Sequence, residues 1–286
     1  RQSGRIDYSA STALVEGKVA SVERNESAAV SLSRLRARDE YHYTHAVNVS
    51  LLAIVFGKHL GLDRAQVRDL GMAGLYHDIG KACLPESILN KPGKLTLWEE
   101  KIAHSHSVEG YRLLKGQPDV PQVVLHAVLE HHERFDGKGY PRGLADGEMH
   151  LFARVVSIVD VFDAITSDRP YAKARPAAEA FRVMYSMRNK DFGANYLEHF
   201  IKSLGIFPVG SFVRLNNGHY AVVCEANSDQ PLRPSVKVVF DSKFRPRRAE
   251  VVDLAQAQAT DLADRLEIVE SLDPRSYKID VMRLLT

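Results

Sequence analysis

An imidazole and a carboxylate stand side by side at His77 and Asp78, and the ammonium of Lys81 follows four residues after the histidine. In a helix, His77 and Lys81 share a face with the apolar Val67 and Leu70, so this face should point into the protein. Burying an acid together with an imidazole is costly unless a partner neutralises them, and a divalent metal ion could pair with both. For the dipeptide alone, an ordinary hydrogen bond near a helix end is an equally good interpretation.

Other predicted helices supply more residues of the kinds that bind metals. Together they make seven nitrogen and oxygen donors on five helices: His45, His77, Asp78, His106, His131, His132 and Asp160. Helical bundles often build metal sites from side chains on facing helices. Donors of this kind without thiolates suit Mn, Fe, Zn or Ni, and Mg is also compatible with them. The sequence therefore predicts a metal site between helices.

One carboxylate can bridge two ions, and Asp78 is the natural bridge. We expect one ion on His45, His77, Asp78 and Asp160, and the other on Asp78, His106, His131 and His132. Two divalent ions, less the two carboxylates and a hydroxide, leave about one positive charge, which favours an anion such as phosphate. Ions about 3.5–4 Å apart lower the pKa of bound water from 15.7 to about 7 and so provide a nucleophile. Lys81 would stabilise the charge that develops on the phosphate.

His104 lies two residues before His106, about 200° away around a helix, so only one of the two should face the site. We choose His106, because Ile102, Gly110 and Leu113 share its side.

Two further residues could support the predicted ligands from behind. His42 shares a helical face with His45, and Asp163 follows Asp160 by about one turn. A hydrogen bond from such a residue would fix the orientation of a ligand. The alternatives are a solvated or structural position for His42 and a capping position for Asp163.

The elements that must carry these residues are helices. Apolar periodicity, capping boxes at Asp63 and Thr96, and helix stops at Gly61 and Pro85 support this prediction. The predicted helical segments are 8–37 (one or two helices, offering a packing or dimer surface), 41–60, 63–84, 96–115, 121–133, 151–166, 177–190 and 194–204. Phe135–Gly147 contains four glycines and a proline, so it must be a loop. Loops of this length in compact domains are usually functional or disordered.

The character of the chain changes at Pro208. Segments 211–215 and 220–224 flank Asn216-Asn217-Gly218 and predict a β-hairpin, and 235–240 predicts a third strand. We expect a mainly α fold with a small C-terminal β-rich appendage. The predicted domains are an N-terminal helical segment at 1–38, a catalytic domain at 39–207 and a β-rich domain at 208–286.

The composition describes a globular protein. Of the 286 residues, 45% are hydrophobic and 26% are charged, and the net charge of +2 gives no electrostatic footprint for duplex nucleic acid. Cys83 and Cys224 are too few for a disulfide framework, which favours a reducing compartment, and Cys83 is expected in the core. The segment contains no apolar run long enough to span a membrane. Because it begins at Arg1, we expect a fragment or processed form, with an upstream sensor or membrane region outside it.

Three stretches together resemble a known family. His77–Lys81, then His131–Pro141 with its Asp-Gly-Lys-Gly-Tyr-Pro run, then Asp160–Lys173 are similar to the HD-GYP domain, a branch of the HD phosphohydrolase superfamily. The likeness extends from about Tyr41 to Gly205. It implies an HD-type helical bundle and a bacterial, cytoplasmic phosphodiesterase that hydrolyses cyclic di-GMP through pGpG toward GMP.

The resemblance also implies roles for individual residues. The family's metal ligands fall on the seven donors named above, with Fe or Mn as the expected metals, and Lys81 matches the active-site lysine. Arg169 and Lys173 match positions near the ligand phosphates, although composition alone would make this basic turn a solvated one. Gly139-Tyr140-Pro141 matches the family's signature motif, which is implied to shape the pocket and to dock diguanylate cyclase (GGDEF) domains. We call the whole loop that contains it, residues 135–147, the signature loop. Asp136, Gly139 and Tyr140 of this loop are expected to bind substrate.

One position departs from the family. Some members hold three metals with a glutamate one turn before the first histidine ligand, and Tyr41 stands there in this chain. A phenol cannot replace that carboxylate, so we predict two metal ions and expect pGpG to accumulate.

Three other functions were considered from the sequence, and two of them stay open. An HD phosphohydrolase acting on another nucleotide would share the metal ligands but would leave the Phe135–Gly147 loop unexplained. A non-catalytic module could sense cyclic di-GMP or dock GGDEF domains through this loop, and a homodimer is compatible with either. A DNA-binding regulator lacks support, since no basic helix is present.

Overall fold

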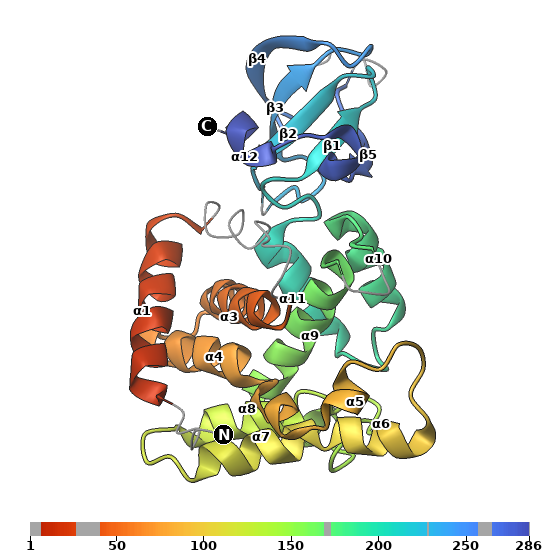
Figure 1. The fold of residues 1–286 in the computed structure, drawn as a ribbon. Coiled ribbons are helices and arrows are strands. Elements are labelled where there is room, and N and C mark those ends of the chain that lie inside the picture. The colour runs from red at the N-terminus through yellow and green to blue at the C-terminus, as the bar shows by residue number, and fades with distance from the viewer. Residues whose placement is uncertain (1–6, 27–40, 169–172, 228, 257–264, 286) are drawn as a thin grey trace.

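The computed structural model describes residues 7–26, 41–168, 173–227, 229–256 and 265–285. A helical body carries a β-sheet unit at one end, as Figure 1 shows. The mainly α fold with a β-rich appendage is thus confirmed. The helices of the body are α1 (Tyr8–Arg24), α3 (Tyr41–His59), α4 (Arg64–Tyr76), α5 (Glu86–Leu89), α6 (Leu97–His104), α7 (His106–Lys115), α8 (Gln122–Glu130), α9 (Leu151–Thr166), α10 (Ala177–Ser186) and α11 (Ala194–Leu204).

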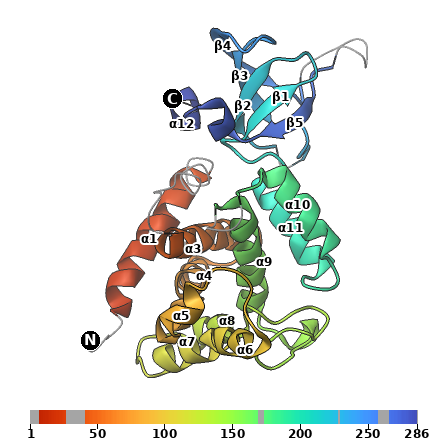
Figure 2. The ribbon, with the colours of Figure 1, turned by 45° about the vertical axis from the view of Figure 1, so that its right-hand side comes forward.

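Helix α3 is the centre of the body. Its residues from Asn48 to Phe56 are all buried, and α1, α4, α9 and α11 pack around it, as both ribbon views indicate (Figures 1 and 2). Helix α4 begins with the predicted capping box, in which Asp63 and Gln66 bond each other's backbone N–H groups. It lies very close to α3, because a Cβ atom on Gly74 would come within 2.9 Å of the Ser50 Cα atom. This close packing holds the end of α4 against the middle of α3.

Four predicted helices are shorter than the sequence indicated, and the one predicted for 121–133 ends at Glu130. The helix from Asp63 ends at Tyr76, and the chain tightens into a 3₁₀ turn (η1, Ile79–Cys83) instead of continuing as an α-helix to Pro85. The helix predicted for 96–115 breaks at Ser105, which separates α6 from α7. The one predicted for 177–190 ends at Ser186.

The 3₁₀ turn brings two distant segments together. A Cβ atom on Gly80 would lie 1.9 Å from the backbone oxygen of His106 and 2.4 Å from the nitrogen of Gly110. Only glycine permits this approach of η1 to α7. Asp78, two residues before Gly80, is thereby placed beside His106. The same turn leaves Cys83 exposed, so the prediction that it packs in the core was wrong.

The described C-terminal residues form a five-stranded antiparallel sheet in the order β4-β3-β2-β1-β5. The strands are β1 (Phe212–Leu215), β2 (Tyr220–Glu225), β3 (Ser235–Phe240), β4 (Pro246–Asp253) and β5 (Ile268–Leu272), followed by the short η4 (Pro274–Tyr277) and α12 (Val281–Leu285). The hairpin β1–β2 turns at Gly218, whose φ of 83° favours glycine. One face of the sheet packs against Ala178 and Ile206 of the helical body. The domain boundaries stay predictions.

Within the parts of the chain that the structure describes, no helix combines the length and apolarity needed to cross a membrane.

Candidate metal centre

The seven predicted ligands converge on one place between the helices. Among the described residues, their ligand atoms form two groups in which every pair of atoms lies within 4.8 Å. We call His45, His77 and Asp160 the first ligand group, and His106, His131 and His132 the second ligand group. Asp78 clusters with the second group and also approaches the first. Helices α3, α4 and α9 bring the first group together, and α7 and the end of α8 bring the second.

The two oxygens of Asp78 face different groups. Oδ2 lies 3.3 Å from the Nε2 atom of His77 and 3.9 Å from that of His45. Oδ1 lies 3.3 Å from the Nε2 atom of His106 and 3.9 Å from that of His131. A carboxylate that presents one oxygen to each of two donor groups has the geometry of a bridging ligand.

The buried polar atoms at the centre fit a metal. His77, His106 and His131 each donate from Nδ1 to the carbonyl oxygen three residues earlier, at 2.7–2.9 Å. Each Nε2 atom is therefore unprotonated and directs its lone pair at the centre. The Nε2 atoms of His106 and His131 are 3.3 Å apart, and two acceptors so close need a cation between them. Among the described residues, His77 Nε2 and Asp78 Oδ1 are also buried without a hydrogen-bond partner.

His45 is held by side chains instead of backbone. Its Nδ1 atom donates to Asp163 Oδ2 at 2.7 Å, and its Nε2 atom lies 3.1 Å from Asp160 Oδ1. Asp163 is buried and also accepts hydrogen bonds from Asn48 at 3.1 Å and Ser167 at 3.0 Å. The structure therefore puts Asp163 behind His45, where it fixes the ring and leaves Nε2 directed at the centre.

The protonation states also fit metal ligands. Burial raises the pKa of Asp78, but its interactions with His77 and Lys81 outweigh that effect, and the pKa lies well below its ordinary value. Burial lowers the pKa of His132 to about 3 and shifts those of His106 and His131 in the same direction. The Asp78 carboxylate is therefore ionised and the second ligand group is neutral near pH 7.

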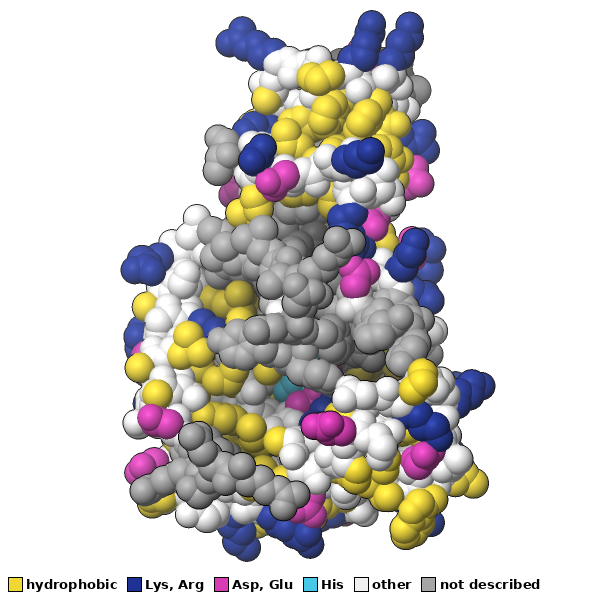
Figure 3. Space-filling view, viewed as in Figure 1, with side chains coloured by type: hydrophobic (Ala, Val, Ile, Leu, Met, Phe, Trp, Pro, Cys, Tyr) yellow, Lys and Arg dark blue, Asp and Glu magenta, His cyan; other side chains and the backbone are white. Residues whose placement is uncertain are grey.

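A cavity of about 270 Å³ lies beside the centre. Its lining includes the ligands His131, His132 and Asp160 together with Gly139 and Tyr140 of the signature loop. Figure 3 shows a hollow in the helical body at whose base histidine, acidic and basic side chains meet. Lys81 bonds the carboxylate of Asp78 and is partly exposed. The cavity thus joins the donor groups to solvent.

His104 lines this cavity as well, so the prediction that only one of the two histidines faces the site was wrong, although His106 is the one that joins the donor groups, as expected. In one continuous helix, His104 and His106 would point to opposite sides. Because the helix breaks at Ser105, His106 faces the donor groups while His104 faces the cavity, where its ring stacks on Tyr140.

Two buried glutamates, which the sequence analysis missed, hold the signature loop and the residues after it through hydrogen bonds to the backbone. Glu133 accepts hydrogen bonds from the backbone N–H groups of Arg142, Gly143 and Leu144 at 2.6–3.1 Å. Glu130 accepts from the backbone of His150 at 3.0 Å. These two acids flank His131 and His132 in the Glu-His-His-Glu segment. The same short segment therefore carries two predicted ligands and holds the loop in place. The available signal was four polar residues in a row after an apolar helix.

The predicted substrate-binding residues have different positions. Tyr140 and Gly139 line the cavity. Asp136 does not line it; its carboxylate bonds the Arg134 guanidinium at 3.0 and 3.1 Å and the Lys138 N–H. Lys173 is exposed. Arg169 and the side chain of His42 lie outside the described residues.

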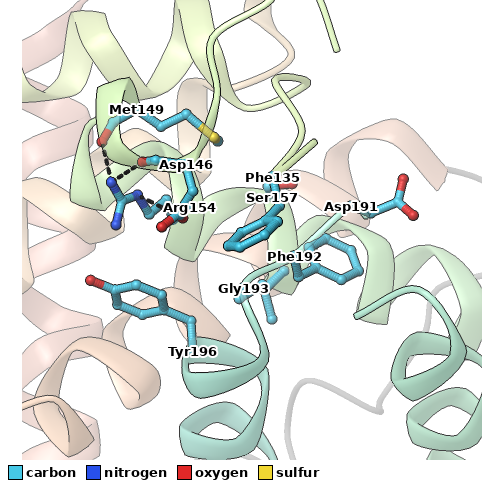
Figure 4. A pocket seen from close by; sticks show the side chains of 10 residues that line it. Phe135, Asp146, Met149, Arg154, Ser157, Asp191, Phe192, Gly193 and Tyr196 are labelled. Atoms are coloured by element: carbon cyan, nitrogen blue, oxygen red, sulfur yellow. Dashed lines mark hydrogen bonds and ion pairs between the residues drawn. The ribbon is translucent and has the colours of Figure 1, made fainter. Parts of the chain in front are cut away.

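A second, smaller cavity of about 10 Å³ adjoins the first and shares Asp191 and Phe192 with it. Figure 4 shows Arg154 reaching the backbone oxygens of Asp146 and Met149, with the Tyr196 ring on the other side of its guanidinium. This space holds about one water molecule. It belongs to the packed wall of the larger cavity.

Comparison with known proteins gives this arrangement a family. The HD domain family matches residues 23–195, and a KOW domain associated with HD domain matches residues 212–279. The chain belongs to the HD domain family. Within that family, the predicted HD-GYP branch is confirmed by its relatives.

Two curated relatives and one solved structure resemble this HD-GYP chain. The cyclic di-GMP phosphodiesterase PA4108 of Pseudomonas aeruginosa is 43% identical over 277 residues, which cover 96% of this chain and 67% of that protein. A cyclic di-GMP phosphodiesterase of Thermotoga maritima is 37% identical over 166 residues, 58% of this chain and 45% of that protein. Bd1817, an HDG"Y"P protein from Bdellovibrio bacteriovorus, shares the fold with a TM-score of 0.58 at 23% identity, over 68% of this chain and 62% of its own. The HD-GYP chain thus spans about two thirds of the first relative and less than half of the second. The family and the His/Asp cluster together indicate divalent metal binding.

Proposed function

We propose that this HD-GYP chain is a metal-dependent phosphodiesterase that hydrolyses cyclic di-GMP to pGpG. The relatives PA4108 and the Thermotoga maritima protein carry the name of this activity. The observation that supports it most is Asp78, whose two oxygens each lie 3.3 Å from the Nε2 atom of a histidine in a different ligand group. Paired divalent ions are a common means of cleaving phosphate esters.

The proposed cofactors are two divalent ions, Fe or Mn, held by the two ligand groups with Asp78 between them. When bound, they supply Lewis acidity and a nucleophile derived from water. The chain itself contributes orientation and charge. Lys81, bonded to Asp78 and partly exposed, is positioned to balance charge on a phosphate oxygen. Tyr140 and Gly139 shape the cavity that would receive the nucleotide.

The proposed main product is pGpG, and conversion to GMP should be slower. This part rests on Tyr41, which stands where a third ion would need a glutamate. Metal analysis of active protein that gave three ions per chain would overturn it.

The direct test is incubation of anaerobically purified protein, loaded with Fe(II) or Mn(II), with cyclic di-GMP and chromatography of the products. We expect pGpG to appear with wild-type protein and not with Asp78→Asn. Parallel incubations should contain ppGpp, a deoxynucleoside triphosphate and a cyclic dinucleotide with one adenine. Faster hydrolysis of any of these would assign the site to another substrate.

We also propose that the signature loop docks GGDEF domains and that the chain acts in the bacterial cytoplasm, where its substrate would be made. Lys138, Pro141 and Arg142 of this loop are exposed and available to a partner. We also propose that the chain can form a homodimer. Light scattering with and without an added GGDEF domain tests both, and Lys138→Glu should weaken the mixed complex without altering metal content.

A further inference from the structure

The helix break at Ser105 places His104 in the cavity beside a residue of the signature loop. The rings of His104 and Tyr140 stack with centroids 3.8 Å apart and an angle of 9° between their planes. Tyr140 also contacts the ligand His132, with centroids 4.7 Å apart. Tyr140 therefore packs against the end of α6 and against the second ligand group at once.

The rest of the loop is held through its backbone. Glu133 bonds the N–H groups of Arg142, Gly143 and Leu144, and Gly139 packs so closely on His132 that a Cβ atom would come within 2.4 Å of its carbonyl oxygen. These contacts fix where the backbone of the loop runs but do not involve the Tyr140 side chain. The ring contacts of that side chain are with His104, His132 and His106, and the stack on His104 is the closest of the three.

We propose that His104 is a positioning residue that acts through Tyr140, clamping the phenol ring against His132 so that the cavity keeps the shape its nucleotide substrate requires. The proposal rests on the proposed function for its substrate. This role requires that residue 104 have a flat ring, and it does not depend on the nitrogen atoms of that ring. A stacked aromatic pair confers a modest stabilisation beyond its buried area, which sets the size of the expected effect.

The test compares two replacements of one residue. His104→Phe keeps a flat ring, and His104→Ala removes it. We expect His104→Ala to lower kcat/KM for cyclic di-GMP about fivefold to tenfold, mainly through KM, while His104→Phe stays within about twofold of wild type. His199→Ala is the matched control, because it removes an imidazole from a tilted ring pair with His59 outside the cavity. Metal content should be equal in all four proteins.

A double-mutant cycle separates clamping from general damage. If His104 acts through Tyr140, then His104→Ala should have no further effect in a Tyr140→Ala background. Equal losses in His104→Phe and His104→Ala, or an additive loss in the double variant, would overturn the proposal.

A measurement that does not depend on catalysis can test the contact between His104 and Tyr140 separately from the proposed function. In protein labelled with fluorotyrosine, the Tyr140 resonance, assigned with Tyr140→Phe, should move in His104→Ala and stay close to its place in His104→Phe. An unchanged resonance in His104→Ala would overturn the clamp even if cyclic di-GMP is hydrolysed. If wild-type protein leaves cyclic di-GMP intact, the proposed function fails while the resonance still reports on the stack.

Discussion

The two ligand groups around Asp78 are built differently. His45 in the first group is oriented by Asp163, which in turn is held by Asn48 and Ser167. In the second group, His106 and His131 are oriented by the backbone carbonyl oxygens of Ala103 and Val128, and His77 of the first group is oriented in the same way by Gly74. A side-chain network can be altered one residue at a time, whereas a carbonyl oxygen moves only with the backbone. The half of the centre formed by the first group is therefore adjustable through His45, whereas His106 and His131 in the other half are fixed by the fold.

The largest effect should come from the residue that the two halves share. Asp78→Asn removes the bridging charge, and we expect both metal ions to be lost and hydrolysis to fall by on the order of 10³-fold or more. Metal analysis and product chromatography measure this. Asp69→Asn is the control, because Asp69 lies on α4, the helix that precedes Asp78 in the chain, and pairs with Arg68 away from the centre. Full metal content in Asp78→Asn would contradict the bridging role.

The next effect should be confined to the first ligand group. Asp163→Asn keeps the size of the side chain but loses the charge that holds His45, and such changes behind a ligand typically cost about 10- to 100-fold in metal affinity or activity. We expect one ion to be retained and the other to be bound weakly in a metal titration. Equal weakening of both ions would show that the halves are not independent.

The metal affinities of the two ligand groups should also depend differently on pH. Burial lowers the pKa of His45, but the hydrogen bonds to Asp160 and Asp163 outweigh it and raise the pKa to about 9. The metal-free protein thus holds a proton there at neutral pH, and this proton stabilises the fold below pH 6.5 and ceases to do so as the pH rises through about 9. A metal must displace it, so affinity at the first group should rise with pH up to about 9, while the second group, with lowered pKa values, should change little.

Calorimetry in buffers of different ionisation enthalpy measures that proton. At pH 7.5 we expect wild-type protein to release about one proton more per chain than His45→Gln when the first group fills, since any proton lost from bound water is lost in both proteins. Equal proton release in the two proteins would place the titrating group elsewhere.

The smallest effect should follow Ser167→Ala. It removes one of the hydrogen bonds to Asp163 and leaves the carboxylate in place, so we expect a loss of about twofold to fivefold in affinity for one ion. Ser203→Ala is a suitable control, because Ser203 bonds a backbone oxygen in α11 away from the centre. A loss as large as that of Asp163→Asn would mean that Ser167 itself determines the position of His45.

The convergence of the donors could be predicted from the sequence because it depends on residue types and helical periodicity. The ligands were predicted on the inward faces of helices, and a metal was the interpretation that brought so many inward-facing donors together. The mainly α fold followed from the same periodicity. The β-hairpin was visible in its Asn-Asn-Gly turn.

What the sequence did not reveal depends on local geometry that several residue types permit. Ser105 fits a continuous helix as well as a break, so nothing in the spacing placed His104 in the cavity. The 3₁₀ turn at Ile79–Cys83 arises because Gly80 must approach the His106 backbone, a tertiary contact. Strand β4 carries Arg247, Arg248 and Glu250 on exposed positions and lacks the apolar alternation that identifies a strand.

The most direct measurement is a crystal structure of manganese-loaded protein with anomalous scattering data. The account predicts two peaks per chain, one against His45, His77 and Asp160 and one against His106, His131 and His132, with the Asp78 carboxylate between them. A single peak, or peaks that leave Asp78 uncoordinated, would contradict it.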